Sequence, residues 1–408
     1  MTSIGIVGSG VAGLHLGLLL RQHDVAATIY ADRTAEEVAS GRLLNTVAHH
    51  DHTLARERAL GVHHWDAAQY GYVCHQHCLS GGPAPVRFRG DFEHPSSIID
   101  YRLYLPRLMR DFEERGGELV VGVVSVGDLE RLSRRHELIV VASGRDGLAS
   151  MFARRDERCP YDRPQRRLSA GIFHGIAYSE PKGVGVHLAV GQGELLELPI
   201  YSREGFATAL LFEAIPGGEL EALVELDPAD GPPEFDAAVL AAVERHFPMV
   251  RERIDASAFA LQGRSDIVRG ALTPIVREDW APLEGGRFAV SLGDAHCVVD
   301  PVNGQGANTA SYAAWALGEA ILADYAFDER FCRRVASDRE AFVLGAFDWT
   351  NAILNPPPHV LELIGAMSQD KAVCDAYTQN FNHPDRQWAA LASPERTAAF
   401  IARHASRG

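Results

Sequence analysis

The sequence predicts an α/β fold that carries an inserted antiparallel β-sheet and ends in a helical region. Three observations lead to this fold class. The chain begins with a strand, a glycine-rich turn, a helix and a second strand. Strand-like stretches broken by Gly and Pro fill residues 170–213, and a later buried strand precedes a long helix. A chain of 408 residues exceeds what one hydrophobic core usually organises, so we expect two closely packed domains, or one domain with a helical extension.

The first domain starts with three short elements. Ser3–Val7 is an apolar strand, and Ala26–Tyr30 is a second one. Between them, Val11–Arg21 is rich in leucine, which indicates a buried helix. A parallel pair of strands joined by a helix is typical of a Rossmann-type unit.

The remaining elements of this domain lie on both sides of the insertion. Tyr101–Arg115 is predicted to be a helix that ends at two glycines, and Glu137–Ser143 has the apolar run of a buried parallel strand. Arg287–Leu292 is another buried strand, and Gly306–Asp324 follows as a long helix. The first domain is therefore expected to be discontinuous in sequence.

The domain ranges follow from these elements. We expect the first domain at 1–70, 100–165 and 265–330, the inserted sheet domain at 71–99 and 166–264, and a helical C-terminal region at 331–408. An apolar helix around Leu361–Met367 would cover either a pocket or a dimer interface.

The composition excludes several classes of protein. With 46% apolar and 23% charged residues and no apolar run of about 20 residues, we expect a soluble globular protein without a membrane-spanning helix. The N-terminus lacks the basic and apolar regions of a signal peptide, so we expect a cytoplasmic location. A net charge of −15 would repel nucleic acid and anionic lipids, which leaves small molecules and proteins as partners.

The cysteines and histidines are not expected to bind a metal. The six cysteines are scattered along the chain, and a cytosolic compartment would keep them as free thiols. Cys74–Cys78 and His49–His52 contain metal-binding residue types. A closed zinc site usually draws a second pair of ligands from elsewhere in the chain, and we expect none here.

The motif GSGVAG at residues 8–13 lies between the first strand and the first helix. In this context Gly8 permits the tight turn, Gly10 lets the backbone approach a pyrophosphate, and Gly13 lets the helix pack on the strand. The unpaired N–H groups and the dipole at the helix N-terminus favour an anion there. Asp32, just beyond the second strand, is the nearest acidic residue for an adenosine ribose.

A second motif separates FAD from NAD. SLGDA at 291–295 ends a buried strand, and PVNGQGAN at 301–308 leads into a helix. Asp294 can offer its carboxylate to a ribityl hydroxyl, and the helix N-terminus can stabilise negative charge on the pyrimidine edge of a reduced flavin. The residues predicted to bind FAD from the two motifs are Gly8, Gly10, Val11, Ala12, Gly13, Asp32, Asp294, Pro301, Gly304, Gln305, Gly306, Ala307 and Asn308. Arg102 either contacts the FAD or pairs with a carboxylate.

The order of these motifs resembles the aromatic-hydroxylase type of FAD monooxygenase. More narrowly, the chain is similar to the oxygenase subunits of the styrene and indole monooxygenase family. The resemblance runs nearly end to end, through IGIVGSGVAGLHLGLLLRQHDV, GRLLNTVAHH, GGPAPVRFRGDF, DYRLY, GDAHCVVDPVNGQGANTASYAAWALGE and FNHPDRQW. It implies a homodimer that receives reduced FAD from a separate NADH-dependent flavin reductase and epoxidises an aryl alkene.

The resemblance also implies the course of the reaction. Reduced FAD and oxygen would give a C4a-peroxyflavin, whose distal oxygen is transferred to the vinyl carbons of the substrate. The cofactor carries this chemistry. The protein must supply a dry cavity and an orientation that brings the alkene to about 3–3.5 Å, and no acid or base acting on the substrate is required.

The resemblance assigns further residues to the flavin ring and the substrate. Additional flavin contacts would come from Arg42, Leu44 and Asn45. The substrate would contact Leu43, Leu44, Val47, His49 and Val302, and the residues in catalytic positions would be Asn45, Tyr72, His75 and Ser96. Asn45 would hydrogen-bond the flavin or the peroxide, whereas the other three would adjust peroxide protonation or hold water. Tyr72 and His75 could equally be ordinary core residues.

The same residues favour one substrate. The pattern at positions 45, 47, 49, 72, 75 and 96 matches styrene rather than indole epoxidation, so styrene is expected and indole is the alternative. The chain departs from the family pattern at Asn303, where an apolar residue would fit, and at Cys74, His77 and Cys78 around His75. These departures bear on the detailed shape of the pocket.

Other classes of flavoprotein are less consistent with the sequence. A single-component hydroxylase that binds NAD(P)H is the main alternative, because SGRDGLAS at 143–150 approximates its Asp-Gly motif, although Arg154 comes one residue late. Flavin halogenases need a Trp-x-Trp motif and an active-site lysine, whereas this chain lacks that motif and its lysines are Lys182 and Lys371. A non-enzymatic FAD carrier would not need the apolar loop at 43–47.

Overall fold

A six-stranded sheet, parallel except at one edge, forms the first domain of the computed structural model, which describes residues 2–226 and 232–406. The expected domain ranges also include residues 1, 227–231 and 407–408, which lie outside the described residues. The strand order is β14-β15-β6-β1-β2-β5. These strands are β1 (Ser3–Val7), β2 (Ala26–Ala31), β5 (Glu118–Val121), β6 (Leu138–Val141), β14 (Trp280–Leu283) and β15 (Arg287–Ser291). The central strand β6 is buried along its whole length, as a parallel sheet covered on both faces requires.

Two helices that are distant in sequence pack tightly beside this sheet. They are α1 (Val11–Gln22) and α10 (Gly306–Ala323), and α5 (Tyr101–Glu114) packs next to α1. A Cβ at Gly318 of α10 would lie 2.4 Å from a methyl carbon of Leu19 in α1, so glycine is required for this contact. The predicted Rossmann-type unit, with a segment near residue 300 completing it, is confirmed.

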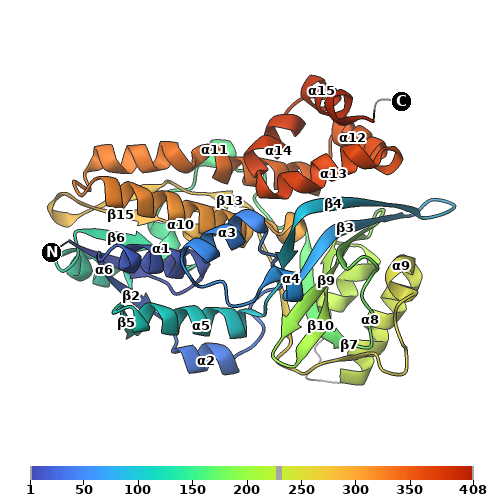
Figure 1. Cartoon of the computed structure of the whole chain (residues 1–408), viewed down its shortest axis with the longest axis horizontal. Coiled ribbons are helices and arrows are strands. Elements are labelled where there is room, and N and C mark those ends of the chain that lie inside the picture. The colour runs from blue at the N-terminus through green and yellow to red at the C-terminus, as the bar shows by residue number, and fades with distance from the viewer. Residues whose placement is uncertain (1, 227–231, 407–408) are drawn as a thin grey trace.

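A second, eight-stranded sheet forms the other half of the molecule (Figure 1). Its strand order is β11-β7-β10-β9-β8-β3-β4, and β12 also pairs with β7. The strands are β3 (Gly71–Ser80), β4 (Val86–Ser97), β7 (Arg167–His174), β8 (Gly183–Ala189), β9 (Gly193–Ser202), β10 (Gly205–Ala214), β11 (Ala260–Leu261) and β12 (Ile267–Ala271). Because β12 belongs to it, this sheet extends beyond residue 264, the expected end of the inserted domain. Neighbouring strands are antiparallel except for β3 and β8.

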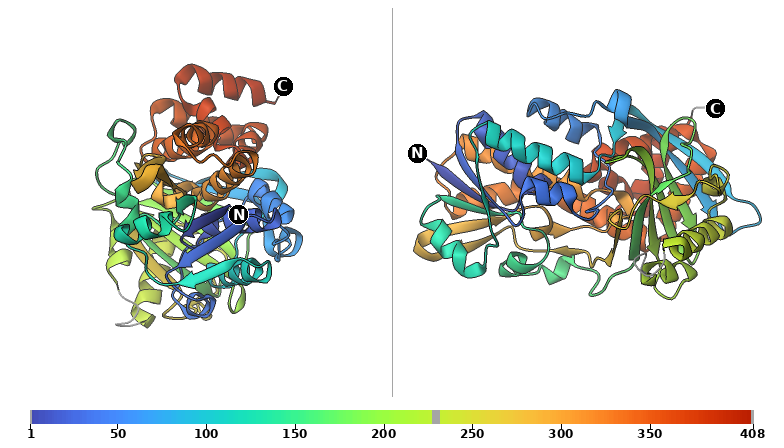
Figure 2. Two further views of the ribbon diagram at one scale, coloured as in Figure 1. Left: turned by 90° about the vertical axis from the view of Figure 1, so that its left-hand side faces the viewer. Right: turned by 90° about the horizontal axis from the view of Figure 1, so that it is seen from below.

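Helices cover both faces of the second sheet. The remaining helices are α2 (Ala35–Ser40), α3 (Asp51–Ala59), α4 (Ala67–Tyr70), α6 (Val126–Ser133), α7 (Ala222–Glu225), α8 (Pro232–His246), α9 (Pro248–Arg251), α11 (Glu329–Leu354), α12 (Pro358–Gln369), α13 (Lys371–Gln379), α14 (Pro384–Leu391) and α15 (Pro394–His404). Leu195 packs in a cluster with residues of α8, whereas Leu196 packs with residues of α12 and α13. Neighbouring residues of one strand point to opposite faces, so the sheet separates α8 from the C-terminal helices. Figure 2 shows the two sheets at opposite ends of the molecule when it is seen from below.

The expectation of free thiols agrees with the structure. All six cysteines are free, and five of them are buried. Among residues 2–226 and 232–406, no group of histidine, cysteine and acidic side chains could hold a metal ion. No described helix combines the length and apolar character that crossing a bilayer requires.

A buried ion-pair cluster fastens the first domain to the second sheet. The Arg102 guanidinium at the start of α5 lies 2.5 Å from carboxylate oxygens of both Asp100 and Asp266. It also donates to the backbone oxygen of Ser265, just before β12. Of the two roles considered for Arg102, the structure therefore places it in carboxylate pairs, and it does not line the cavity described below.

Substituting Arg102→Ala should lower the free energy of unfolding by about 3–5 kcal/mol, because buried Asp100 would lose its cation and Asp266 would keep only its longer pair with Arg203 at 3.4 Å. Urea unfolding followed by circular dichroism measures this change. Arg110→Ala in the same helix is the control, since its ion pair with Glu36 is exposed to water and should contribute little to stability. Equal effects of the two substitutions would contradict this view of the cluster.

Candidate functional site

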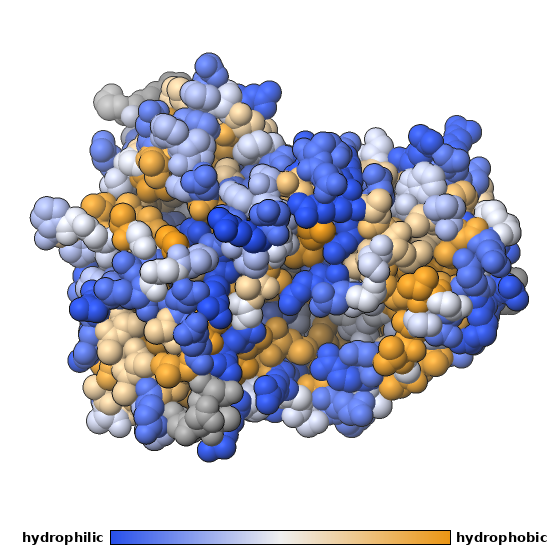
Figure 3. All heavy atoms as spheres, turned by 180° about the vertical axis from the view of Figure 1, so that it is seen from behind, coloured by the Kyte–Doolittle hydropathy of each residue, from blue (hydrophilic) through white to orange (hydrophobic). Residues whose placement is uncertain are grey.

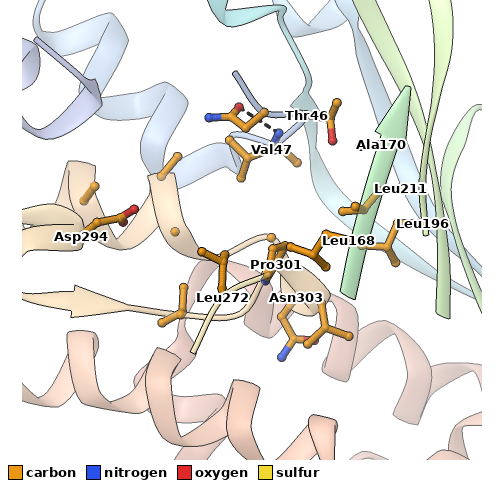
Figure 4. Close-up of a pocket in the computed structure, with 18 of the residues that line it drawn as sticks. Thr46, Val47, Leu168, Ala170, Leu196, Leu211, Leu272, Asp294, Pro301 and Asn303 are labelled. Carbon is orange, nitrogen blue, oxygen red and sulfur yellow. Dashed lines mark hydrogen bonds between the residues drawn. The ribbon is translucent and has the colours of Figure 1, made fainter. Parts of the chain in front are cut away.

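A cavity of about 1440 Å³ lies between the two sheets. It is larger than the roughly 300–1,000 Å³ of most small-molecule sites, so it has room for a long cofactor together with a substrate. On the face shown in Figure 3, a hollow between the two halves of the molecule has hydrophobic side chains in its depth. Figure 4 shows the centre of the cavity, where the loop with Thr46 and Val47 faces Pro301 and strands of the second sheet.

The first glycine motif has the geometry of a dinucleotide-binding turn. Gly8 has a φ of +118°, and a Cβ there would lie 2.2 Å from the backbone oxygen of Ala142. A Cβ at Gly13 would lie 2.0 Å from the backbone oxygen of Gly8, so α1 can approach β1 only because Gly13 lacks a side chain. A Cβ at Gly10 would meet no atom within 4 Å. Gly10 therefore presents open backbone to the cavity at the N-terminus of α1.

Polar residues from three segments complete this end of the cavity. Asp32, directly after β2, lines the cavity with an exposed side chain that pairs with Arg33 at 3.2 Å. Asp294 lines it from the turn after β15 with an exposed side chain, and partial desolvation raises its pKa despite the opposing charges of Arg145 and Arg277. Gly304, with a φ of +59°, leaves open space before α10. Both ends expected for FAD thus face one cavity.

The centre of the cavity is mainly apolar. Leu44 and Val47 line it from the loop before α3, and Pro301 and Val302 line it from the loop before α10. The second sheet contributes Leu168, Ala170, Leu196 and Leu211 (Figure 4). The Asn45 side chain accepts a hydrogen bond from the Val47 backbone N–H at 3.4 Å, which is long, so its amide can also serve a ligand. Such walls exclude water while leaving a few polar atoms for orientation.

Three buried histidines and a tyrosine form the wall next to β3. Tyr72, His75 and His77 come from β3 itself, and His50 comes from the N-terminus of α3. Burial raises the pKa of Tyr72. It lowers the pKa of His50 and of His77 to about 3, and it lowers the pKa of His75 well below its ordinary value. All four side chains are therefore uncharged at neutral pH. His75 Nδ1 and His77 Nε2 have no hydrogen-bond partner among the described residues.

His50 and His77 line the cavity but were not among the predicted site residues, although His77 was noted as a departure that bears on the shape of the pocket. His77 could have been found, because residues 75 and 77 share one face of a strand. His50 could not, because it reaches the cavity through the tertiary position of α3, with its Nδ1 3.0 Å from Ser96 Oγ. Ser96 therefore lies behind His50 rather than at the cavity surface.

Several other residues assigned from the sequence do not line the cavity. They are Gly13, Arg42, Leu43, His49, Ser96, Arg102, Gln305 and Asn308. Arg42 is exposed, Leu43 is in a hydrophobic core, and His49 is hydrogen-bonded to Glu57 and Tyr101 in a buried network. Asn308 accepts from the His50 backbone N–H at 3.0 Å and donates to the Ala48 oxygen at 2.8 Å. Such residues hold the loops of the wall in place from behind.

Known proteins resemble this chain along nearly its whole length. Two proteins named styrene monooxygenase StyA, from Pseudomonas fluorescens and from a Pseudomonas species, are each 44% identical to it, with 98% of both chains covered. The family of styrene monooxygenase A substrate-binding domains matches residues 144–253. This chain belongs to the styrene monooxygenase family. It is an FAD-dependent monooxygenase, as predicted, with oxygen as co-substrate.

Solved structures outside the styrene monooxygenase family share its fold. The probable FAD-dependent monooxygenase PqsL of Pseudomonas aeruginosa is 15% identical, with a TM-score of 0.63 and 98% of this chain and 99% of that chain covered. The myxobacterial chondrochloren halogenase CndH is also 15% identical, with a TM-score of 0.61 and coverage of 99% and 97%. The predicted fold, an FAD-binding α/β domain with an inserted sheet and a helical C-terminus, is confirmed.

The cavity residues of this styrene monooxygenase family member fit FAD. Open backbone at Gly10 and Gly304 leaves room where a pyrophosphate and a flavin would approach. The Asn303 amide nitrogen is buried beside the cavity without a hydrogen-bond acceptor among the described residues.

A buried pair of carboxyl groups lies behind the loop that precedes α10. Glu213 of β10 and Asp300 are both fully buried, and Asp300 Oδ1 accepts from the Val302 backbone N–H at 3.2 Å. The nearby Arg166 is neutralised by Glu194 through two hydrogen bonds of 2.6 and 2.8 Å. No described N–H or O–H group reaches the other three carboxyl oxygens, so a shared proton is their available donor. Burial and the neighbouring Asp300 raise the pKa of Glu213 well above its ordinary value.

Glu213→Gln should reduce the pH dependence of stability. A carboxyl group whose pKa is raised by folding stabilises the protein fully below the ordinary glutamate pKa of 4.5, and this contribution is lost as the pH rises through the raised pKa. Thermal unfolding followed upward from pH 4.5 should show wild-type protein losing up to about 1.4 kcal/mol per pH unit relative to the variant. Glu204→Gln, at an exposed site, is the control; identical pH profiles of all three proteins would refute the shared proton.

Gly10→Val should weaken FAD binding at least about tenfold, or about 1.4 kcal/mol, because the side chain would occupy open cavity space while meeting no protein atom near its Cβ. Titration of the apoprotein with FAD, followed by flavin fluorescence, measures the affinity. Gly82→Val, in the β3–β4 turn, has similarly open surroundings and should leave it unchanged. Unaltered FAD affinity in the Gly10 variant would remove this glycine from the binding site.

Proposed function

We propose that this chain is the oxygenase component of a two-component monooxygenase that epoxidises styrene or a related aryl alkene. Reduced FAD would come from a separate NADH-dependent flavin reductase, and the working form would be a cytoplasmic homodimer. The observation that carries this proposal is the apolar cavity centre, bounded by Leu44, Val47 and Val302 and facing both FAD motifs. The names of the two relatives support styrene as the substrate.

The protein residues would orient the substrate and exclude water. Bound FAD, once reduced, supplies the activation of oxygen. Leu44, Val47 and Val302 would contact the aryl ring and fix its orientation. The side-chain amide of Asn45 would form a hydrogen bond with the edge of the flavin. Burial keeps His75 uncharged, so this side chain adds no charge to the cavity wall.

Two alternatives belong to the same site. Indole is the alternative substrate, since it is also aromatic and apolar. A single-component hydroxylase would take NAD(P)H itself, but Arg154 pairs with Asp156 at 3.0 Å and donates to the Tyr161 oxygen at 2.9 Å. This arrangement uses Arg154 within its own loop, which favours the two-component proposal.

The test is product formation from styrene and, separately, from indole with purified protein, FAD and NADH. We expect epoxide when an unrelated flavin reductase is added and none without it, and the ratio of products decides between styrene and indole. Oxidation of NADH by the protein alone would instead establish the single-component hydroxylase.

Asn45→Ala should uncouple oxygen use from epoxidation. Loss of one hydrogen bond of about 1.4 kcal/mol corresponds to a roughly tenfold fall in epoxide formed per oxygen consumed. Oxygen-electrode and gas-chromatography measurements on the same samples give this ratio. Gln22→Ala, at the end of α1 away from the cavity, should retain the wild-type ratio, and retention by the Asn45 variant as well would exclude Asn45 from the mechanism.

A further inference from the structure

The cavity continues beyond the FAD motifs as an arm beneath α12. Its floor is one face of the second sheet, including Leu188 and Leu196. Its roof includes Ile364 and Met367, which project from α12. In Figure 1, α12 lies above the second sheet on the side where β3 and β4 are. Of the two roles predicted for an apolar helix in this region, covering a pocket is the one that the structure shows.

The arm reaches the protein surface at its far end. Val190, in the turn between β8 and β9, lines the cavity and is 67% exposed. Leu361 of α12 also lines it and is 52% exposed. A Cβ at Gly191 would meet no atom within 4 Å. Residues that belong to both the cavity wall and the outer surface mark an opening between the β8–β9 turn and α12.

The two ends of the cavity differ in chemistry. The end near β2 is lined by Asp32, Arg33, Arg145 and Asp146, whose side chains are largely exposed. The far opening is rimmed by Val190 and Leu361.

Charged groups within the arm are already paired. Arg166 and Glu194, which line it, neutralise each other, and Arg269 donates to the Val224 backbone oxygen at 3.3 Å. An apolar molecule can therefore move through the arm without desolvating an unpaired charge.

We propose that the apolar substrate reaches the flavin through this second opening, between Val190 and Leu361, while FAD occupies the polar opening near β2. The inference rests on the proposed function, since it takes the substrate to be a small aromatic hydrocarbon. Bound FAD would fill the polar end with its adenosine and pyrophosphate, so a second route lets substrate and product exchange without release of the cofactor. Transfer of an apolar molecule from water into the apolar arm is also favourable, because apolar surface is removed from water.

Val190→Trp tests the route, because a bulky side chain at an exposed turn narrows the opening without entering the core. The measurement is the rate at which styrene perturbs the absorbance of the oxidised FAD complex in a stopped-flow instrument. We expect Val190→Trp to slow this rate at least fivefold and to leave FAD affinity unchanged. Leu361→Ala, which widens the same opening, should keep or raise the wild-type rate.

Val123→Trp is the matched control, because Val123 is 86% exposed and lines the opposite, polar end of the cavity. It should weaken FAD binding and leave the styrene rate of the FAD-saturated protein unchanged. An unchanged styrene rate in Val190→Trp, or a slower one in Val123→Trp, would overturn the proposed route. The stopped-flow rates measure styrene binding and not epoxidation. If the protein binds styrene without epoxidising it, the proposed function is refuted, but these rates still test the proposed route. Failure of the wild-type protein to bind either styrene or indole would overturn both.

Discussion

The close packing of α1 against α10 determines where the site can form. Gly318 lets the two helices approach each other, and each helix begins at a glycine-rich turn on the cavity. Two helix N-termini, encoded far apart in the sequence, are thereby brought to the same edge of one sheet. Their unpaired N–H groups favour negative charge at two points of a long ligand. The remaining parts of the cavity are added around this fixed pair.

The FAD-binding half was predictable because its signals are local. The close contact of Gly13 with Gly8 involves residues near each other in sequence, so motif and geometry correspond directly there. The same holds for the strands and helices whose apolar patterns match their burial. The parallel sheet, the inserted antiparallel sheet and the helical C-terminus could all be derived in this way.

The other half of the site depends on tertiary pairing that no short pattern encodes. Arg102 was open between cofactor and carboxylate, and its partner Asp266 joins it only when β12 pairs with β7. The carboxyl pair of Glu213 and Asp300 brings together a strand of one domain and a loop of the other. His50 reaches the wall because Asn308 fixes the start of α3. In each case, which residue meets which is decided by the packing of whole elements.

The parallel pairing of β3 with β8 has a consequence for the synthesis of the chain. Residues of β3 leave the ribosome long before Gly183–Ala189, their partner strand, exists. Until then β3 can pair with β4 alone, and a lone hairpin is marginally stable in water. Non-local pairing of this kind slows folding and leaves an unpaired edge open to aggregation. The histidines of β3 that line the cavity therefore belong to the part of the protein that becomes ordered late, and a cell that makes this enzyme has to protect that edge for as long as translation takes.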